Sequence, residues 1–364
     1  MQLGVKGRLA IEIVLVSLII PSAFAQPEDA TIDTIRDLQT ISQTDQGRIR
    51  EWVQKQVEQN LAQPAGSGSA TFTQFRSRLQ SQYTNSKNSP AFRSQLAAQT
   101  AVVVAAELVK PNIKPAPAEA MARVLLDMNG IDTFPGLLAG LKCSIPAARY
   151  LCLRGLTLQK ENIAKDKQKL TDAVVAIQTA GVNEDSPIIL SQTYRALAYS
   201  TQVADVLPAY LALFDHRLSL RRERNQRVAG AELDAFEFFR TPGVANALSA
   251  EQKAQLAQRV AVFLRLDAER YSRSAVERKT DGTISGELES EEVVGMERSM
   301  EAAETVLISL GAGKTAGIAD ELGKGGHARR AEVLAQAHKW VGNSTTKEQG
   351  ILNAAPWNVP IGAP

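Results

Sequence analysis

Ile145-Pro146-Ala147-Ala148-Arg149-Tyr150-Leu151-Cys152-Leu153-Arg154-Gly155-Leu156 is the most informative segment of this sequence. Its apolar residues recur at helical spacing, and Pro146 stands where the first turn of a helix tolerates proline. The apolar stretch Phe134 to Leu141 precedes it across a short break. Two short helices joined in this way predict an antiparallel pair.

The same pattern of helices and short breaks continues on both sides. Residues at the breaks, such as Pro111, Asn129-Gly130 and Pro187, stop one helix or begin the next. The predicted helices span 91–109, 117–129, 133–142, 146–158, 162–180, 187–199 and 203–220. Connections this short favour stacked antiparallel helical hairpins over residues 90–220.

The segment Ile145 to Leu156, together with the apolar stretch Phe134 to Leu141 before it, resembles one unit of a HEAT-type helical repeat. In that family a short first helix ends in a tight turn, and the second begins with proline or alanine and carries a small residue and leucine near its end, as Gly155 and Leu156 do. Ser186 to Ala198, followed by Val203 to Leu213, resembles a degenerate second copy. The resemblance implies an α-solenoid whose concave surface binds partners, and it implies no reaction.

The regions outside 90–220 also favour helices. Residues 26–89 hold N-terminal helices and linkers, including a helix over 46–60 that Thr44 or Asp45 caps. Residues 221–341 form a C-terminal region with longer helices over 221–240, 248–273, 288–310 and 326–341, and Ser249 and Gln252 offer a capping box. Residues 342–364, with three prolines, read as an extended tail.

Composition agrees with an all-α class. Only 5% of residues are aromatic, and no segment alternates apolar and polar residues as a strand does. The 44% of hydrophobic residues suffice for a core. A formal net charge of +2 provides no general attraction to nucleic acid, so we expect no nucleic-acid partner.

The first 25 residues predict a cleavable export signal. Lys6 and Arg8 precede the apolar run Ile13 to Ile20, and Ala23 and Ala25 place small side chains before a cleavage site at Gln26. The alternative, a retained membrane anchor, needs about 18 apolar residues, more than this run provides. We therefore expect a chain exported to the periplasm, the cell envelope or the medium, with no membrane span after cleavage.

Cys143 and Cys152 are the only cysteines. An oxidising compartment favours a disulfide between them. The alternative is two buried small apolar side chains, because Cys152 lies about one helical turn, roughly 5 Å, too far along its helix for ideal pairing.

The most basic segment lies between Asp215 and Arg227. On a helix, Arg217, Arg221 and Arg224 share one face and predict a basic stripe for a carboxylate-bearing or sulfated partner. The alternative is a solvated face, which the acidic residues 287–292 could neutralise.

Catalytic, cofactor-binding and metal-binding motifs are weak throughout. Gly311-Ala312-Gly313-Lys314-Thr315 is similar to the end of a phosphate-binding loop, but the required earlier glycine is Ile308, so a glycine-capped helix end explains it better. The three histidines lack metal-binding spacing. We assign no catalytic, cofactor or metal residues.

These patterns favour a non-catalytic adaptor or scaffold that binds a protein partner or an anionic envelope component. It would do so through a broad face with the basic stripe and with exposed aromatic residues such as Tyr150, Tyr194 and Tyr199. The alternative is an exported all-α enzyme, a hydrolase or lyase acting on a polymer, with carboxylates and arginines in a groove.

Overall fold

The computed structural model describes residues 30–62, 69–223, 230–273, 277–278, 284–285, 290–313, 317–324 and 330–361. The predicted all-α class is confirmed. The helices are α1 (Ala30–Asp33), α2 (Gln43–Leu61), α3 (Ser69–Thr84), α4 (Pro90–Leu108), α5 (Pro115–Met128), η1 (Ile131–Thr133), α6 (Phe134–Gly140), α7 (Pro146–Leu158), α8 (Lys160–Ile163), α9 (Lys167–Val182), α10 (Pro187–Leu197), α11 (Val203–Arg222), α12 (Leu233–Phe239), α13 (Pro242–Ala247), α14 (Ala250–Arg273), α15 (Ser290–Ser309), α16 (Ile318–Gly323), α17 (Arg330–Val341) and η2 (Ile351–Asn353).

The described chain contains two strands of two residues each, β1 (Glu277–Arg278) and β2 (Ile284–Ser285), which pair in antiparallel orientation. Within the same ranges, no helix combines the length and the apolar character that crossing a membrane requires.

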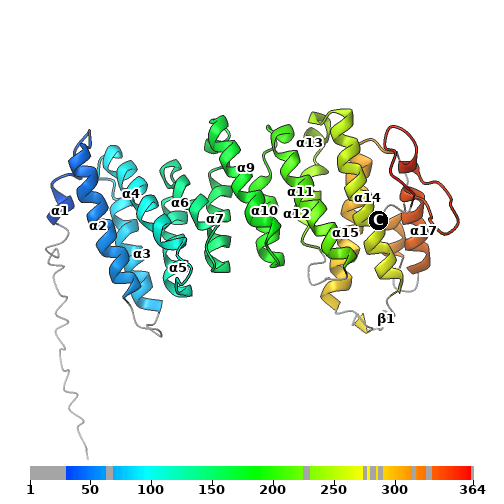
Figure 1. The fold of residues 1–364 in the computed structure, drawn as a ribbon, viewed down its shortest axis with the longest axis horizontal. Helices are drawn as coiled ribbons and strands as arrows, with labels where there is room; N and C mark the ends of the chain where they lie inside the picture. The colour runs from blue at the N-terminus through cyan, green and yellow to red at the C-terminus, as the bar shows by residue number, and fades with distance from the viewer. Residues whose placement is uncertain are drawn as a thin grey trace, which may run out of the picture.

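The helices pack as two parallel series along an elongated molecule (Figure 1). Successive members of each series contact one another, and contacts between α2 and α3, α4 and α5, α6 and α7, α9 and α10, and α14 and α15 join the two series. The first series is α2, α4, α6, α9, α11, α14 and α17, and the second is α3, α5, α7, α10, α12 and α15. Because a short hairpin cannot bury its apolar face alone, each pair depends on its neighbours for a core.

Local sequence explains where the helices start. Proline occupies the first turn of α4, α5, α6, α7, α10 and α13. Ser42, rather than the predicted Thr44 or Asp45, caps α2, and the carboxylate of Asp45 completes the capping box from inside the helix. The predicted box at α14 is confirmed by reciprocal hydrogen bonds between Ser249 and Gln252.

Glycines allow close contacts inside the hairpin of α6 and α7. The sulfur of Cys152 in α7 occupies the position where a side chain at Gly140 in α6 would lie, and a Cβ at Gly155 would come within 2.7 Å of Leu137. The small residues in this segment therefore set the distance between α6 and α7.

The prediction of a single helix over 221–240 is wrong. The helix α11 ends at Arg222, residues 224–229 lie outside the described ranges, and α12 begins at Leu233. Gly230 adopts φ +87°, which a residue inside a right-handed helix cannot have. This turn brings Glu232 back toward α11.

The C-terminal segment is not an extended tail. Leu352, Trp357 and Val359 are buried, and the amide of Gln258 in α14 donates to the carbonyl of Trp357 (3.3 Å). Asn353 donates to the carbonyls of Val341 and Val359. Apolar side chains in this segment therefore cover the last helices of the stack.

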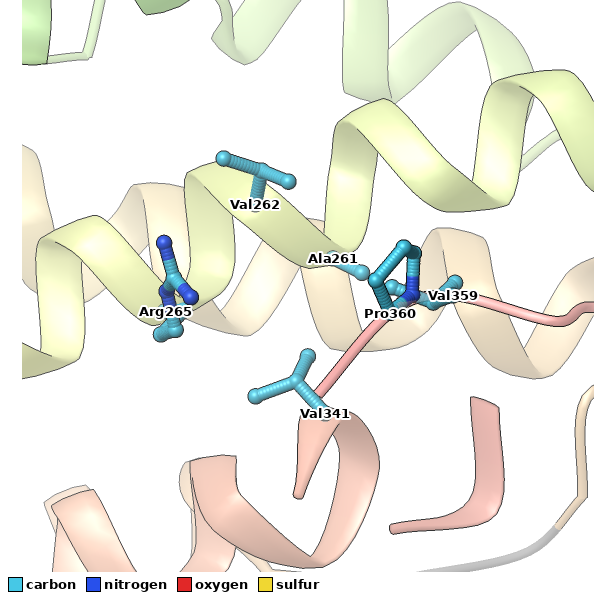
Figure 2. Close-up of a pocket in the computed structure, with 6 residues that line it drawn as sticks. All are labelled: Ala261, Val262, Arg265, Val341, Val359 and Pro360. Atoms are coloured by element: carbon cyan, nitrogen blue, oxygen red, sulfur yellow. The ribbon is translucent and has the colours of Figure 1, made fainter. Parts of the chain in front are cut away.

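Figure 2 shows the edge of this covering segment. Val359 and Pro360 lie beside Ala261 of α14, and Val341 from the end of α17 faces them. The cavity between them is about 10 Å³, room for about one water molecule. It is a packing seam, too small for a ligand.

Candidate functional site

The predicted basic stripe is wrong for two of its three arginines. Arg217 is 1% exposed and Arg221 is 9% exposed, so neither reaches a partner at the surface. Glu232, which is fully buried, accepts from Arg217 Nε (3.0 Å) and from Arg221 Nη2 (2.6 Å), and Arg221 Nη1 donates to Asp267. Arg224 lies outside the described residues. The acidic partners come from α14 and from the turn before α12, and the stripe is an internal ion cluster.

The cluster is electrically balanced, with two arginines against two carboxylates. Burial disfavours the charge on Glu232, but Arg221 and Arg217 outweigh it and hold the pKa of this carboxyl below its usual value. At Asp267 burial dominates over the attraction of Arg221, and the pKa is raised. The cluster therefore links α11, the turn before α12 and α14 through ion pairs. Its charges sum to zero, so it presents no net charge to a ligand.

The aromatic residues expected at the surface are largely internal. Tyr194 is fully buried and Tyr199 is nearly so, whereas Tyr150 is partly exposed. Tyr194 belongs to an aromatic cluster with Tyr210, Phe214, Phe236, Phe238, Phe239 and Phe263. The guanidinium of Arg221 lies over the ring of Phe263, 4.8 Å from its centre, so this cluster adjoins the ion cluster.

Cys143 and Cys152 are buried free thiols, and the predicted disulfide is not formed. Cys143 Sγ accepts a hydrogen bond from the amide of Ile145 (3.5 Å), while Cys152 points into the space above Gly140. Burial, with a smaller contribution from Cys143, raises the pKa of Cys152. The two cysteines therefore behave as small core residues.

The segment similar to a phosphate-binding loop ends a helix. After α15 the amide of Gly311 donates to the carbonyl of Ile308, and the amide of Ala312 donates to that of Leu307. Gly311 has φ +89°. This is a Schellman motif, so the preferred interpretation as a glycine-capped helix end is confirmed at these residues. Lys314 and Thr315 lie outside the described ranges.

Lys160, at the start of α8, is half-buried without a carboxylate partner within the described chain. Its Nζ donates to the carbonyl of Ala198 (3.2 Å) and lies 6.0 Å from the centre of the Tyr199 ring. Burial lowers the pKa of this ammonium to about 8, because removal from water disfavours the charged form.

We expect the Lys160 amine to become reactive near pH 8, whereas an ordinary lysine becomes reactive near pH ~10.4. Brief acylation at a series of pH values, followed by peptide mass spectrometry, measures this midpoint. Lys160→Arg identifies the labelled peptide, because it removes the signal. A labelling midpoint near that of ordinary lysine would show that burial does not perturb this amine.

A cleft of about 690 Å³ lies on the second series of helices, where α10, α12 and α15 meet. Its volume is in the range of sites that bind small molecules or peptide side chains. The lining residues are Pro187, Ile188, Ser191, Arg195, Gly230, Ala231, Leu233, Asp234, Val294, Gly295 and Arg298.

One wall of the cleft comes from α10 and α12. Ser191 and Arg195 are one helical turn apart on α10, and both donate to Asp234 at the start of α12, with Arg195 Nε 2.7 Å from Oδ1. These bonds fix the position of the wall. Ile188, one turn earlier on α10, is 69% exposed, the largest exposure among the large hydrophobic residues of the described chain.

The floor of the cleft is a close approach of two backbones. A Cβ at Gly230 would lie 3.4 Å from the Cα of Gly295, so the turn before α12 rests directly on α15. Ala231, Leu233 and Val294 make the surrounding surface apolar. The φ of +87° at Gly230 lets the same turn send Glu232 inward to the ion cluster while its neighbours line the cleft.

The opposite rim carries Arg298 of α15, which is exposed. Within the described chain this side chain forms no hydrogen bond and no ion pair. With Arg195, Asp234 and Arg298 as its charged lining residues, the cleft has a net charge of +1. It can therefore hold an apolar group beside an anionic one.

Sequence reasoning missed this cleft. Ser191 and Arg195 show helical spacing, but their partner Asp234 is 43 residues from Ser191, and no local pattern predicts that contact. Gly230 and Ala231, which line the cleft together with Ile188, belong to a turn inside the stretch predicted as one helix. The detectable signal was the glycine itself, at a position where a helix would have favoured another residue.

Fold and cleft together define an all-α protein with a surface cleft that is lined by apolar and charged side chains. Comparison of the chain with protein-family models, with curated proteins and with solved structures finds no match.

Proposed function

We propose that this chain is an exported, non-catalytic binding protein, a HEAT-like α-solenoid that acts as an adaptor or scaffold in the periplasm or cell envelope. The cleft between α10, α12 and α15 is the surface that receives a segment of a partner protein. The export part of this proposal rests on residues 1–25 and the solenoid part on the packing of successive hairpins in two series.

The observation that carries the binding part is the exposed Ile188 at the edge of an apolar cleft. Exposing so much of an isoleucine side chain to water is unfavourable, and a partner that covers it gains roughly 1.5–3 kcal/mol. The wall behind it is already fixed by the bonds to Asp234, so little order is lost on binding. Rigid, apolar clefts of this kind are typical recognition sites for peptide segments.

Ile188→Asp is expected to weaken binding at the cleft by roughly tenfold or more, because it replaces the apolar contact with a charge that must be desolvated. The probe is a displayed library of short random peptides, selected on the purified chain from Gln26 onward, with affinities of the synthesised peptides measured by fluorescence polarisation.

Ile308→Asp is the matched control. Ile308 is an exposed isoleucine on α15 that does not line the cleft, so its substitution should leave the affinities unchanged. Selected peptides that bind both variants as tightly as the original chain would place the binding surface elsewhere. A library that yields no binding peptide would contradict the proposed function.

A further inference from the structure

The positive charge in the cleft has donors that the chain itself does not use. Arg195 donates from Nε to Asp234, and neither of its Nη atoms makes a hydrogen bond within the described residues. Arg298, on the part of the rim that α15 forms, also donates no hydrogen bond within the described residues. Two guanidinium groups therefore present unoccupied N–H groups at one cleft, the arrangement that carboxylates bind best.

The carboxylates near the cleft do not accept hydrogen bonds from these unoccupied N–H groups. Asp234 already accepts from Ser191 with one oxygen and from Arg195 with the other, so both its oxygens are engaged. Glu301 follows Arg298 on α15, but burial and the repulsion of Glu297 raise the pKa of this carboxyl, and the charge of Arg298 only partly offsets them. Arg298 is thus close enough to affect Glu301 without forming an ion pair.

We propose that the segment bound in the cleft is acidic: an aspartate or glutamate carboxylate binds Arg298 and the Nη edge of Arg195, and an adjacent apolar side chain covers Ile188 and Leu233. This inference rests on the proposed function, and it adds the chemistry of the partner. Asp234 contributes to the selectivity of this site in two ways. It holds Arg195 in one orientation, and it repels a ligand carboxylate placed too far toward α12.

The test uses the peptides selected on the full chain from Gln26 onward. We expect them to be enriched in aspartate or glutamate next to an aliphatic residue. Arg298→Glu should weaken a selected acidic peptide by roughly tenfold or more, and the same peptide with its acid replaced by lysine should bind Arg298→Glu more tightly than the original chain. Arg154→Glu is the control, because Arg154 is an exposed arginine on α7 that does not line the cleft.

The source of the carboxylate is separated by comparing each peptide as a free acid and as a C-terminal amide. Affinity that persists in the amide and is lost when the internal acid is changed supports recognition of a side chain. Affinity lost in the amide would overturn that part of the proposal in favour of a chain terminus.

Failure of this inference differs from failure of the proposed function. If Ile188→Asp abolishes binding but the selected peptides carry no acid and tolerate Arg298→Glu, the cleft binds peptides and the acidic preference is refuted. If neither substitution affects any selected peptide, the cleft is not the binding surface and both proposals fall.

Discussion

Replacing Glu232 with glutamine is expected to destabilise the protein by about 3–5 kcal/mol. Glu232 is the shared partner of Arg217 and Arg221, and beyond the bond from Nε to Glu232 the guanidinium of Arg217 forms no hydrogen bond from Nη1 or Nη2 within the described chain. Glutamine keeps the size of the side chain but leaves a buried positive charge without compensation. Equilibrium unfolding in guanidinium chloride, followed by circular dichroism, measures the change in the free energy of unfolding.

Asp267→Asn serves as the comparison, because it also removes one negative charge from the cluster. Within the described chain Asp267 forms an ion pair with Arg221 alone, and burial already raises the pKa of its carboxyl. Because Asp267 pairs with one arginine whereas Glu232 pairs with two, we expect a clearly smaller loss for Asp267→Asn. Equal losses in the free energy of unfolding for the two variants would mean that the contact of Glu232 with two arginines stabilises the protein no more than the contact of Asp267 with one.

The two carboxyls also shift stability with pH in opposite directions. The pKa of Glu232 is depressed in the folded state, so its contribution is present above its unfolded pKa of about 4.3 and is lost as the pH falls through the lower folded value. The raised pKa of Asp267 makes the folded state take up protons more readily than the unfolded chain. Asp267 therefore offsets part of the acid sensitivity that Glu232 creates.

Phe214→Ala is expected to cost about 3–5 kcal/mol, the range for truncating a fully buried phenylalanine. The ring of Phe214 packs against Tyr194, Tyr210, Phe236 and Phe263, with centre-to-centre distances of 5.9, 6.3, 5.9 and 5.3 Å. Rings held on four sides cannot move to fill the cavity, so little of the loss is recovered. The same unfolding measurement in denaturant checks this value.

Phe72→Ala provides the control for aromatic truncation. Phe72 in α3 is only partly buried against the core, so its loss should be markedly smaller. A loss at Phe214 as small as that at Phe72 would indicate that the aromatic cluster relaxes around the cavity.

Most of the helices between Pro90 and Leu197 could be predicted from sequence, because proline and Asn-Gly breaks mark their ends directly. Prediction failed where the chain depends on distant contacts. The stretch 221–240 has helical spacing, yet Glu232 is drawn inward by two arginines of α11, and the turn at Gly230 interrupts the helix. The segment after Val341 contains proline, but Trp357 and Val359 find apolar surface on α14 and α17 that no local pattern reveals.

The candidate site was harder to predict for the same reason. A row of arginines at helical spacing has the same appearance in sequence whether it faces water or a buried carboxylate, and only Glu232 and Asp267 distinguish the two cases. Arg298 was not singled out, because a single arginine on an amphipathic helix carries no signal. Within the described chain it forms no ion pair, and Asp234, the carboxylate that lines the same cleft, is already engaged by α10.

The neighbour-to-neighbour packing of the two series has a mechanical consequence for the cleft. Because successive members of each series contact one another, small rotations at successive interfaces would add up along the molecule and change its curvature. The cleft spans three successive members of one series, α10, α12 and α15, so such a change in curvature would alter the distance between its walls. A contact that curves the ends of this elongated molecule would thereby change the shape of a cleft far from the point of contact.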